Sequence, residues 1–302
     1  MYGPVIDIIL PIFGILLIGY TTASFGWFDQ TAVRGLTRYV FDFAVPMLLL
    51  RTLATTSLPD EIPWDYLAAY YLGTLTVLFT GIFITGVFWK RTFSERVINA
   101  FSGCFSNTVL LGIPVILLAF GERATLPLFV IIGTHGLIML PLFTIMLEMG
   151  KSGRAPIPTV IARTSYGLFT NPLIIGLLSG VACNLFEITL WKPLDEMAKL
   201  LGDSVTPGAL FALGATLSGF REKIQWQEVP LIVGVLATQV FDIRNTTWVQ
   251  VLVMLAAMPT GVNPFLFASR YNVGQSVSSG TAFISTVFSI FSLSVLLAYF
   301  QQ

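Results

Sequence analysis

The feature that most constrains this chain is the length of its apolar runs. Ten such runs are separated by short polar connections. A helix needs about 20 apolar residues, at 1.5 Å each, to cross the hydrocarbon core of a bilayer. Charged residues make up 11% of the chain, whereas soluble domains carry roughly a quarter. We therefore predict an all-α integral membrane protein. Its expected spans are residues 5–24, 31–53, 65–89, 97–120, 125–148, 168–186, 204–220, 229–243, 248–269 and 276–300.

Two of these runs are interrupted in the middle by residues that break helices. The fourth contains SNTVLLGIP at residues 106–114, and the ninth contains MPTGVNP at residues 258–264. Pro, Gly and Asn at that depth free backbone groups, which are tolerated only where the backbone is buried in protein or lines a cavity. Two broken spans in matching places indicate the binding site of a transporter. The simpler alternative is two proline kinks without a ligand.

The chain also repeats itself. Adding 161 to a position links residues of the same kind: Pro11 with Pro172, Gly19 with Gly180, Arg38 with Lys199, Asp42 with Asp203 and Pro46 with Pro207. Each half, 1–150 and 151–302, then holds five spans. An odd number of spans per half predicts two halves of opposite topology, an inverted repeat.

The offset fails in the eighth span, which is unusually short. Its uncharged core, residues 229–241, has 13 residues. At 1.5 Å per residue this reaches about 20 Å, less than the roughly 30 Å hydrocarbon core. A natural deletion and an edited chain are both open explanations.

Orientation follows from the basic residues. With the N-terminus outside, eleven of the 16 Lys and Arg residues fall on the cytoplasmic side and five on the other, as the positive-inside rule expects. Both termini are thus predicted on the non-cytoplasmic side. The N-terminus has no basic region, so the first run is predicted to be a retained span and not a signal peptide. The net charge of zero argues against nucleic acid as a partner.

The broken spans also carry a family resemblance. SNTVLLGIP resembles the fourth-span signature of the auxin efflux carrier family, and LAAMPTGVNPFLFA at residues 255–268 resembles its ninth-span counterpart. TPGALFALG at residues 206–214 is similar to the seventh span of that family. The resemblance covers the whole chain. The connection between the halves is short, so the chain resembles a compact prokaryotic member, which implies the bacterial inner membrane.

This resemblance implies ten spans in a 5+5 inverted repeat on a fold like that of bile acid/sodium symporters. Spans 1, 2, 6 and 7 would form a scaffold domain, and spans 3–5 and 8–10 a transport domain that moves like an elevator. The substrates of the family are organic anions, namely auxin in plants and malate- or malonate-type carboxylates in bacteria. The fourth-span asparagine of the family falls on Asn107, and a polar fifth-span contact falls on His135. The resemblance is also compatible with assembly into a homodimer.

The chemistry of the broken spans favours an anion. Each half-helix that follows a break presents N–H groups and about half a positive charge, and the Asn amides can donate hydrogen bonds to a carboxylate. The expected substrate-binding residues are Asn107, Thr108, His135, Gly261 and Asn263, and the expected helix breaks are Pro114, Pro259 and Pro264.

Two further interpretations stay open. His135, the single histidine, is either a structural residue of an apolar helix or a group that faces a cavity and titrates near neutral pH. The pairs Asp42–Pro46 and Asp203–Pro207 are expected to be structural, with the carboxylates capping helices or pairing with Arg38 and Lys199, while a role in ion coupling is the alternative.

Other classes of protein fit less well. A serine hydrolase lacks a G-x-S-x-G elbow, and one histidine with two scattered cysteines makes no metal site, so neither an enzyme nor a cofactor is expected. A receptor or sensor would need a signalling domain. A sodium-coupled organic anion symporter is the nearest alternative.

Overall fold

The computed structural model describes residues 3–56, 64–150, 166–167, 170–219 and 246–300. In this part of the chain the regular structure is helical, and the one β-type contact is an isolated bridge. The predicted all-α class is therefore confirmed. Five described stretches are long and apolar enough to cross a membrane: Ile6–Ser24, Trp64–Trp89, Thr108–Gly150, Lys192–Ser218 and Gln275–Phe300.

The helices follow the expected spans closely. The first part of the chain forms α1 (Gly3–Ser24), α2 (Gln30–Tyr39), η1 (Val40–Ala44), α3 (Val45–Thr55), α4 (Trp64–Trp89), α5 (Phe93–Cys104), η2 (Thr108–Gly112), α6 (Ile113–Phe120), η3 (Gly121–Ala124) and α7 (Thr125–Gly150). The second part forms α9 (Pro172–Leu185), α10 (Lys192–Asp203), α11 (Val205–Ser218), α12 (Thr246–Ala256), α13 (Asn263–Tyr271) and α14 (Gln275–Phe300). The predicted short eighth span, 229–243, lies outside the described residues.

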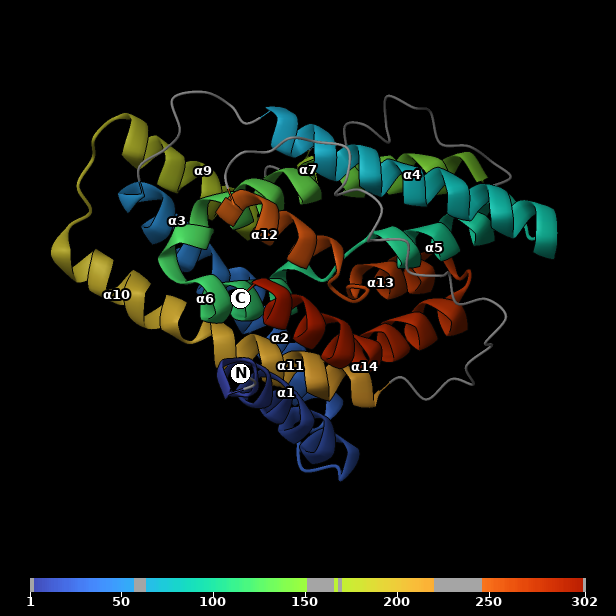
Figure 1. The fold of residues 1–302 in the computed structure, drawn as a ribbon, viewed down its shortest axis with the longest axis horizontal. Helices are drawn as coiled ribbons and strands as arrows, with labels where there is room; N and C mark the ends of the chain where they lie inside the picture. Colours follow the sequence, from blue (N-terminus) through green and yellow to red (C-terminus); the bar gives the residue numbers. More distant parts are fainter. Residues whose placement is uncertain (1–2, 57–63, 151–165, 168–169, 220–245, 301–302) are drawn as a thin grey trace.

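Helices from the two halves of the chain pack side by side. α1 packs along α11, and α3 packs along α9 and α10. Figure 1 shows α3, α9 and α10 gathered at one end of the molecule and α4, α5 and α13 at the other, with α6 and α12 between them. An ion pair between Arg51 of α3 and Asp195 of α10, 2.8 Å apart, joins two of the helices at the first end.

Close packing of α9 on α3 depends on glycine. A side chain on Gly176 would run into the backbone of Pro46, and one on Gly180 would run into the carbonyl oxygen of Leu50. Two glycines four residues apart therefore let the backbones of the two helices approach each other closely. The G-x-x-x-G pattern at Gly176 and Gly180 thus acts as a packing motif.

Two π-turns interrupt helices just before prolines. η1 precedes Pro46, and η2 precedes Pro114. A proline has no N–H, and its ring clashes with the carbonyl four residues earlier. The helix therefore widens, and backbone hydrogen bonds join residues that are five apart. Val45 N–H donates to the carbonyl of Val40, and Gly112 N–H donates to that of Asn107 at 2.9 Å. Such turns often occur at functional sites.

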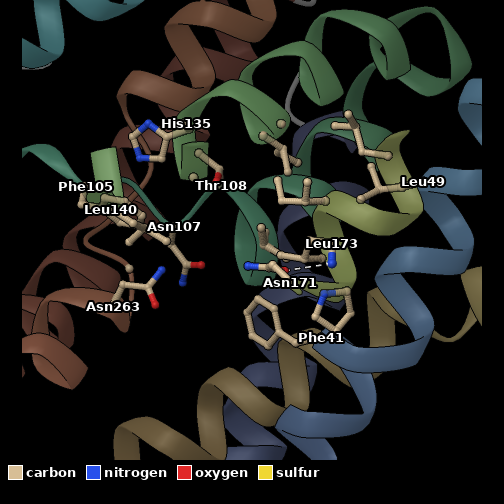
Figure 2. A pocket seen from close by; sticks show the side chains of 18 of the residues that line it. Phe41, Leu49, Phe105, Asn107, Thr108, His135, Leu140, Asn171, Leu173 and Asn263 are labelled. Atoms are coloured by element: carbon tan, nitrogen blue, oxygen red, sulfur yellow. Dashed lines mark hydrogen bonds between the residues drawn. The ribbon is translucent and has the colours of Figure 1, made fainter. Parts of the chain in front are cut away.

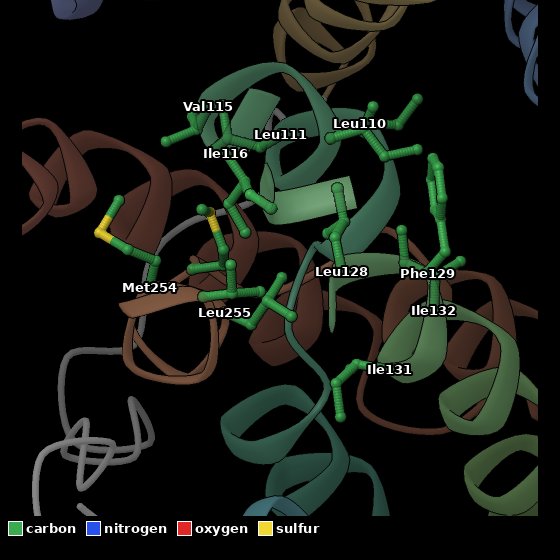
Figure 3. Close-up of a cluster of buried hydrophobic side chains, with 14 of the residues drawn as sticks. Leu110, Leu111, Val115, Ile116, Leu128, Phe129, Ile131, Ile132, Met254 and Leu255 are labelled. Carbon is green, nitrogen blue, oxygen red and sulfur yellow. The ribbon is translucent and has the colours of Figure 1, made fainter. Parts of the chain in front are cut away.

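The largest buried cluster holds the interrupted helices together. Leu110 and Leu111 of η2 and Ile116 of α6 pack with Leu128 of α7 and Leu255 of α12 (Figure 3). A second cluster lies among α4, α5, α7 and α13 and includes Phe101 and Phe143, whose rings stack 3.6 Å apart. The buried side chains thus fix both broken spans from two sides.

Candidate substrate-binding site

The two broken spans meet at their unwound segments. α5 ends at Cys104 and α12 ends at Ala256, and the chain between each of these and the next helix is non-helical, with an isolated bridge residue in each segment. Ser106 and Thr260 form an antiparallel bridge. Asn107 N–H donates to the carbonyl of Pro259 at 2.8 Å, and Gly261 N–H donates to that of Phe105 at 2.9 Å. Each segment therefore supplies hydrogen-bond partners to backbone groups of the other, which the hydrocarbon of a membrane could not do.

Thr260 ties this pairing to two neighbouring helices. Its hydroxyl donates to the carbonyl of Ser102 on α5, and its N–H donates to the hydroxyl of Ser285 on α14 at 3.0 Å. All three residues are buried. Polar groups buried in this way are costly unless they are paired, so these bonds hold the second unwound segment in one position.

Only one of the two polar atoms of the Asn107 side chain has a hydrogen-bond partner among the described residues. Its Oδ1 accepts a hydrogen bond from Leu110 N–H at 3.2 Å and so caps the π-turn η2. The side chain is 5% exposed, and its Nδ2 has no hydrogen-bond partner among the described residues. A buried donor without a partner costs about 1–3 kcal/mol, and a bound ligand with an acceptor would remove that cost.

A cavity of about 320 Å³ lies beside this donor. Its walls come from η1, the first unwound segment with η2, α7, the start of α9, and the start of α13. Figure 2 shows Asn107, Thr108, His135 and Asn263 on one side of it and Asn171, Leu173 and Phe41 on the other. Gly261 also lines the cavity. The structure therefore brings all five expected substrate-binding residues together around one space.

His135 lies at this cavity in an aromatic setting. Its ring centroid is 4.4 Å from that of Phe105 and 5.5 Å from that of Tyr70. The residue is 1% exposed, and both ring nitrogens are without hydrogen-bond partners among the described residues. His135 can thus offer either a donor or an acceptor to a molecule in the cavity.

The prolines of the expected helix breaks fall at the ends of helices. Pro114 and Pro264 occupy the first turns of α6 and α13, and the carbonyl of Pro259 takes part in the pairing described above. Pro46 and Pro207 lie in the first turns of α3 and α11, but Pro46 is buried and follows η1, whereas Pro207 is exposed.

The two expected aspartates differ in their surroundings. Asp42 lies in η1, lines the cavity and pairs with Arg38 at 2.9 Å. Asp203 is the exposed last residue of α10, and no ion pair joins it to Lys199 in the described part of the chain. The repeat predicted equal roles for these residues, but the π-turn carries only Asp42 to the cavity.

Asn171 is a cavity residue that the sequence interpretation missed. It is the N-cap of α9, and its Oδ1 accepts from Leu173 N–H at 2.9 Å. The signal that could have found it is the dipeptide Asn171-Pro172, which recurs as Asn263-Pro264. Both asparagines stand where a helix begins at the cavity wall.

The electrostatics of the cavity come mainly from helix ends. Among the described lining residues Asp42 is the charged one, and its partner Arg38 is largely exposed. The helices that begin at η2, α13 and α9 each present an N-terminus at the wall, worth about half a positive charge each. No group of three potential metal ligands occurs in the described residues. The site therefore suits a small anion that accepts hydrogen bonds.

Comparison with known proteins identifies the class. The model of a family described as "Membrane transport protein" matches residues 4–297. The chain therefore belongs to this family, that of the auxin efflux carriers, and is an integral membrane transporter and not an enzyme.

Individual relatives cover almost the whole chain. A protein of Rhizobium meliloti (strain 1021) named "Putative malonate transporter" is 27% identical over 96% of this chain and 94% of its own length. Auxin efflux carrier component 8 of Arabidopsis thaliana is 22% identical, with 92% and 93% covered. The uncharacterized transporter YfdV of Escherichia coli (strain K12) is 23% identical, with 92% of each chain covered.

Proposed function

We propose that this protein is a secondary carrier of small organic anions, with carboxylates of the malonate type as its substrates, and that the anion binds at the crossing of the two broken spans. The observation that carries this proposal is the buried Nδ2 of Asn107, which has no partner in the described residues and lies at the cavity wall. A carboxylate oxygen is the acceptor that this donor lacks.

The neighbouring groups suit the same ligand. Asn263 and Thr108 can donate further hydrogen bonds, and the N-termini of α13 and of η2 followed by α6 offset about one negative charge together. A cavity of about 320 Å³ is at the small end of ligand pockets. Size and charge therefore both favour a small carboxylate, and the malonate named in the relative from Rhizobium meliloti is the first substrate to test.

An inverted repeat accounts for the packing of glycines in the two halves. A side chain on Gly19 would run into the carbonyl oxygen of Phe211, and one on Gly180 would run into that of Leu50. Adding 161 converts Gly19 to Gly180 and Leu50 to Phe211, so the two contacts are the same contact made once by each half. The equal 26-residue lengths of α7 and α14 are consistent with this repeat.

The same repeat suggests how the carrier moves. α1 packs along α11 and α3 along α9, and η1 and α10 contact both pairs, which would make these helices a scaffold domain. α5 contacts α4, α7, α13 and α14, which would form the transport domain. The cavity has walls from both groups. We infer an elevator-like movement of the transport domain along the scaffold, which would expose the cavity to each side of the membrane in turn.

The test is binding and uptake of radiolabelled malonate by purified protein in proteoliposomes, with and without sodium. Asn107→Asp keeps the size of the side chain but replaces the donor with a negative charge. We expect malonate affinity to fall by about ten- to a hundredfold or more, because one charge-assisted bond is worth about 1.5–3 kcal/mol. Asn272→Asp is the matched control, since Asn272 is an exposed residue at the end of α13 and lies away from the cavity lining.

Three outcomes separate the alternatives. Unchanged malonate affinity in a well-folded Asn107→Asp variant would place the site elsewhere. If that variant bound a cation more tightly than the wild-type protein does, the natural substrate would be a cation and not an anion. Uptake that requires sodium would favour the sodium-coupled symporter over uncoupled or proton-coupled transport.

A further inference from the structure

The cavity has a second polar wall opposite the crossing of the broken spans. This wall is the start of α9, where Asn171, Pro172, Leu173 and Ile174 all line the cavity. α9 packs mainly along α3 and makes a smaller contact with α7, where Leu177 lies against Gly133. This wall is therefore held chiefly by α3, and a ligand in the cavity can touch it and the crossing of the broken spans at once.

Asn171 is fixed so that its amide nitrogen is available. Its Oδ1 is bound to Leu173 N–H at 2.9 Å, which orients the side chain and leaves the two N–H groups of Nδ2 on the other side of the amide. Figure 2 shows the nitrogen of Asn171 directed toward the side of the cavity that carries Asn107 and Asn263. The donors of the two walls thus face the same space.

The first turn of α9 adds a positive potential to this donor. α9 has 14 residues, and its N-terminal end is worth about half a positive charge. Together with the helix ends at η2 and α13, the cavity then faces about one and a half positive charges from helix ends. The negative charge of Asp42, the charged residue among the described lining residues, is paired with Arg38. The helix ends together exceed the charge of a monocarboxylate and approach that of a dicarboxylate. The buried donor of Asn107, on the opposite wall, is independent support for a ligand in this space.

We propose that Asn171 and the N-terminus of α9 form a second carboxylate subsite, so that the carrier binds small dicarboxylates by one carboxylate at each wall. This inference rests on the proposed function, because it assumes that the first carboxylate binds at Asn107. The selectivity of the carrier then comes from the distance between the walls and from the donors at both ends. A monocarboxylate leaves the donors of one wall unpaired.

The decisive variant is Asn171→Asp. Asp caps a helix as well as Asn does, so its carboxylate still accepts from Leu173 N–H and α9 keeps its N-cap. The change replaces a donor with a negative charge at the second subsite only. Its probes are malonate and monomethyl malonate, which is of similar shape but has one carboxylate blocked as an ester. Binding of each probe is measured by isothermal titration on the purified full-length protein, and thermal unfolding checks the fold.

We expect wild-type protein to bind malonate at least about tenfold more tightly than monomethyl malonate, in line with one charge-assisted bond. In Asn171→Asp this preference should fall to about twofold or less, mainly through weaker malonate binding. Asn107→Asp should weaken both probes, because both need the first subsite.

Other results would overturn the inference. If wild-type protein binds both probes equally, no second subsite exists while the proposed function stands. If Asn171→Asp weakens the binding of both probes by the same factor, or of neither, Asn171 does not bind the second carboxylate. If wild-type protein binds neither probe, the proposed function fails together with the inference.

Discussion

The bond between Ser285 and the unwound segment of the ninth span offers a sharp test of what holds the crossing together. Ser285 accepts from Thr260 N–H at 3.0 Å, and its own hydroxyl donates to Ala282 within α14 at 3.3 Å. Ser285→Ala removes the acceptor and leaves the N–H of a buried residue, 8% exposed, without that partner. An unsatisfied buried backbone donor costs about 1–3 kcal/mol.

The same helix supplies a matched control one turn away. Ser289 is also buried, at 2% exposed, but its hydroxyl donates only within α14, to the carbonyl of Thr286 at 2.7 Å. That carbonyl belongs to the helix ladder already, so Ser289→Ala should cost no more than about 1 kcal/mol. Any general effect of losing a serine from α14 is therefore shared by both variants.

The assay is reversible unfolding in mixed micelles with increasing denaturing detergent, followed by circular dichroism. We expect Ser285→Ala to lower the free energy of unfolding by about 1–3 kcal/mol and Ser289→Ala by clearly less. Equal losses in the two variants would refute the reasoning, because they would mean that the bond across the crossing adds nothing to stability.

Two further predictions concern packing and orientation. Gly180→Ala should destabilise the protein by about 1–3 kcal/mol, because its Cβ would meet backbone atoms of α3, whereas Gly14→Ala, with open space around it, should be neutral or slightly stabilising; equal unfolding midpoints would contradict this. A cysteine in place of Lys192 should react with an impermeant thiol reagent in intact cells and one in place of Lys90 should not, as the excess of basic residues on one side predicts; the reverse pattern would invert the topology.

The sequence predicts those parts of the site that depend on local composition. Pro114 and Pro264 interrupt apolar runs, and a break at such residues follows from the missing N–H whatever the fold around it. The placement of Asn107 and His135 at the cavity follows from the same local reasoning, since polar residues inside a membrane protein face a protein-lined space.

The parts that were not predicted depend on packing between distant segments. Asn171 looks like an ordinary helix cap in the sequence, and it reaches the cavity only because glycines let α9 lie close against α3. Asp42 and Asp203 occupy equivalent places in the repeat, yet a π-turn forms before Pro46 and not before Pro207. A constant offset identifies positions that are equivalent in the repeat. The local backbone geometry decides which of two equivalent side chains lies at the cavity.

The pairing of the two unwound segments has a consequence for how the protein is made. Ser106 emerges from the ribosome about 150 residues before Thr260, the residue with which it pairs. At about 5–20 residues per second, the interval is roughly 8–30 seconds. During that time the exposed backbone of the fourth span has to be shielded by water, by the insertion machinery or by a partner helix, because lipid cannot satisfy it. The first half of this chain is therefore expected to complete its insertion only when the second half arrives.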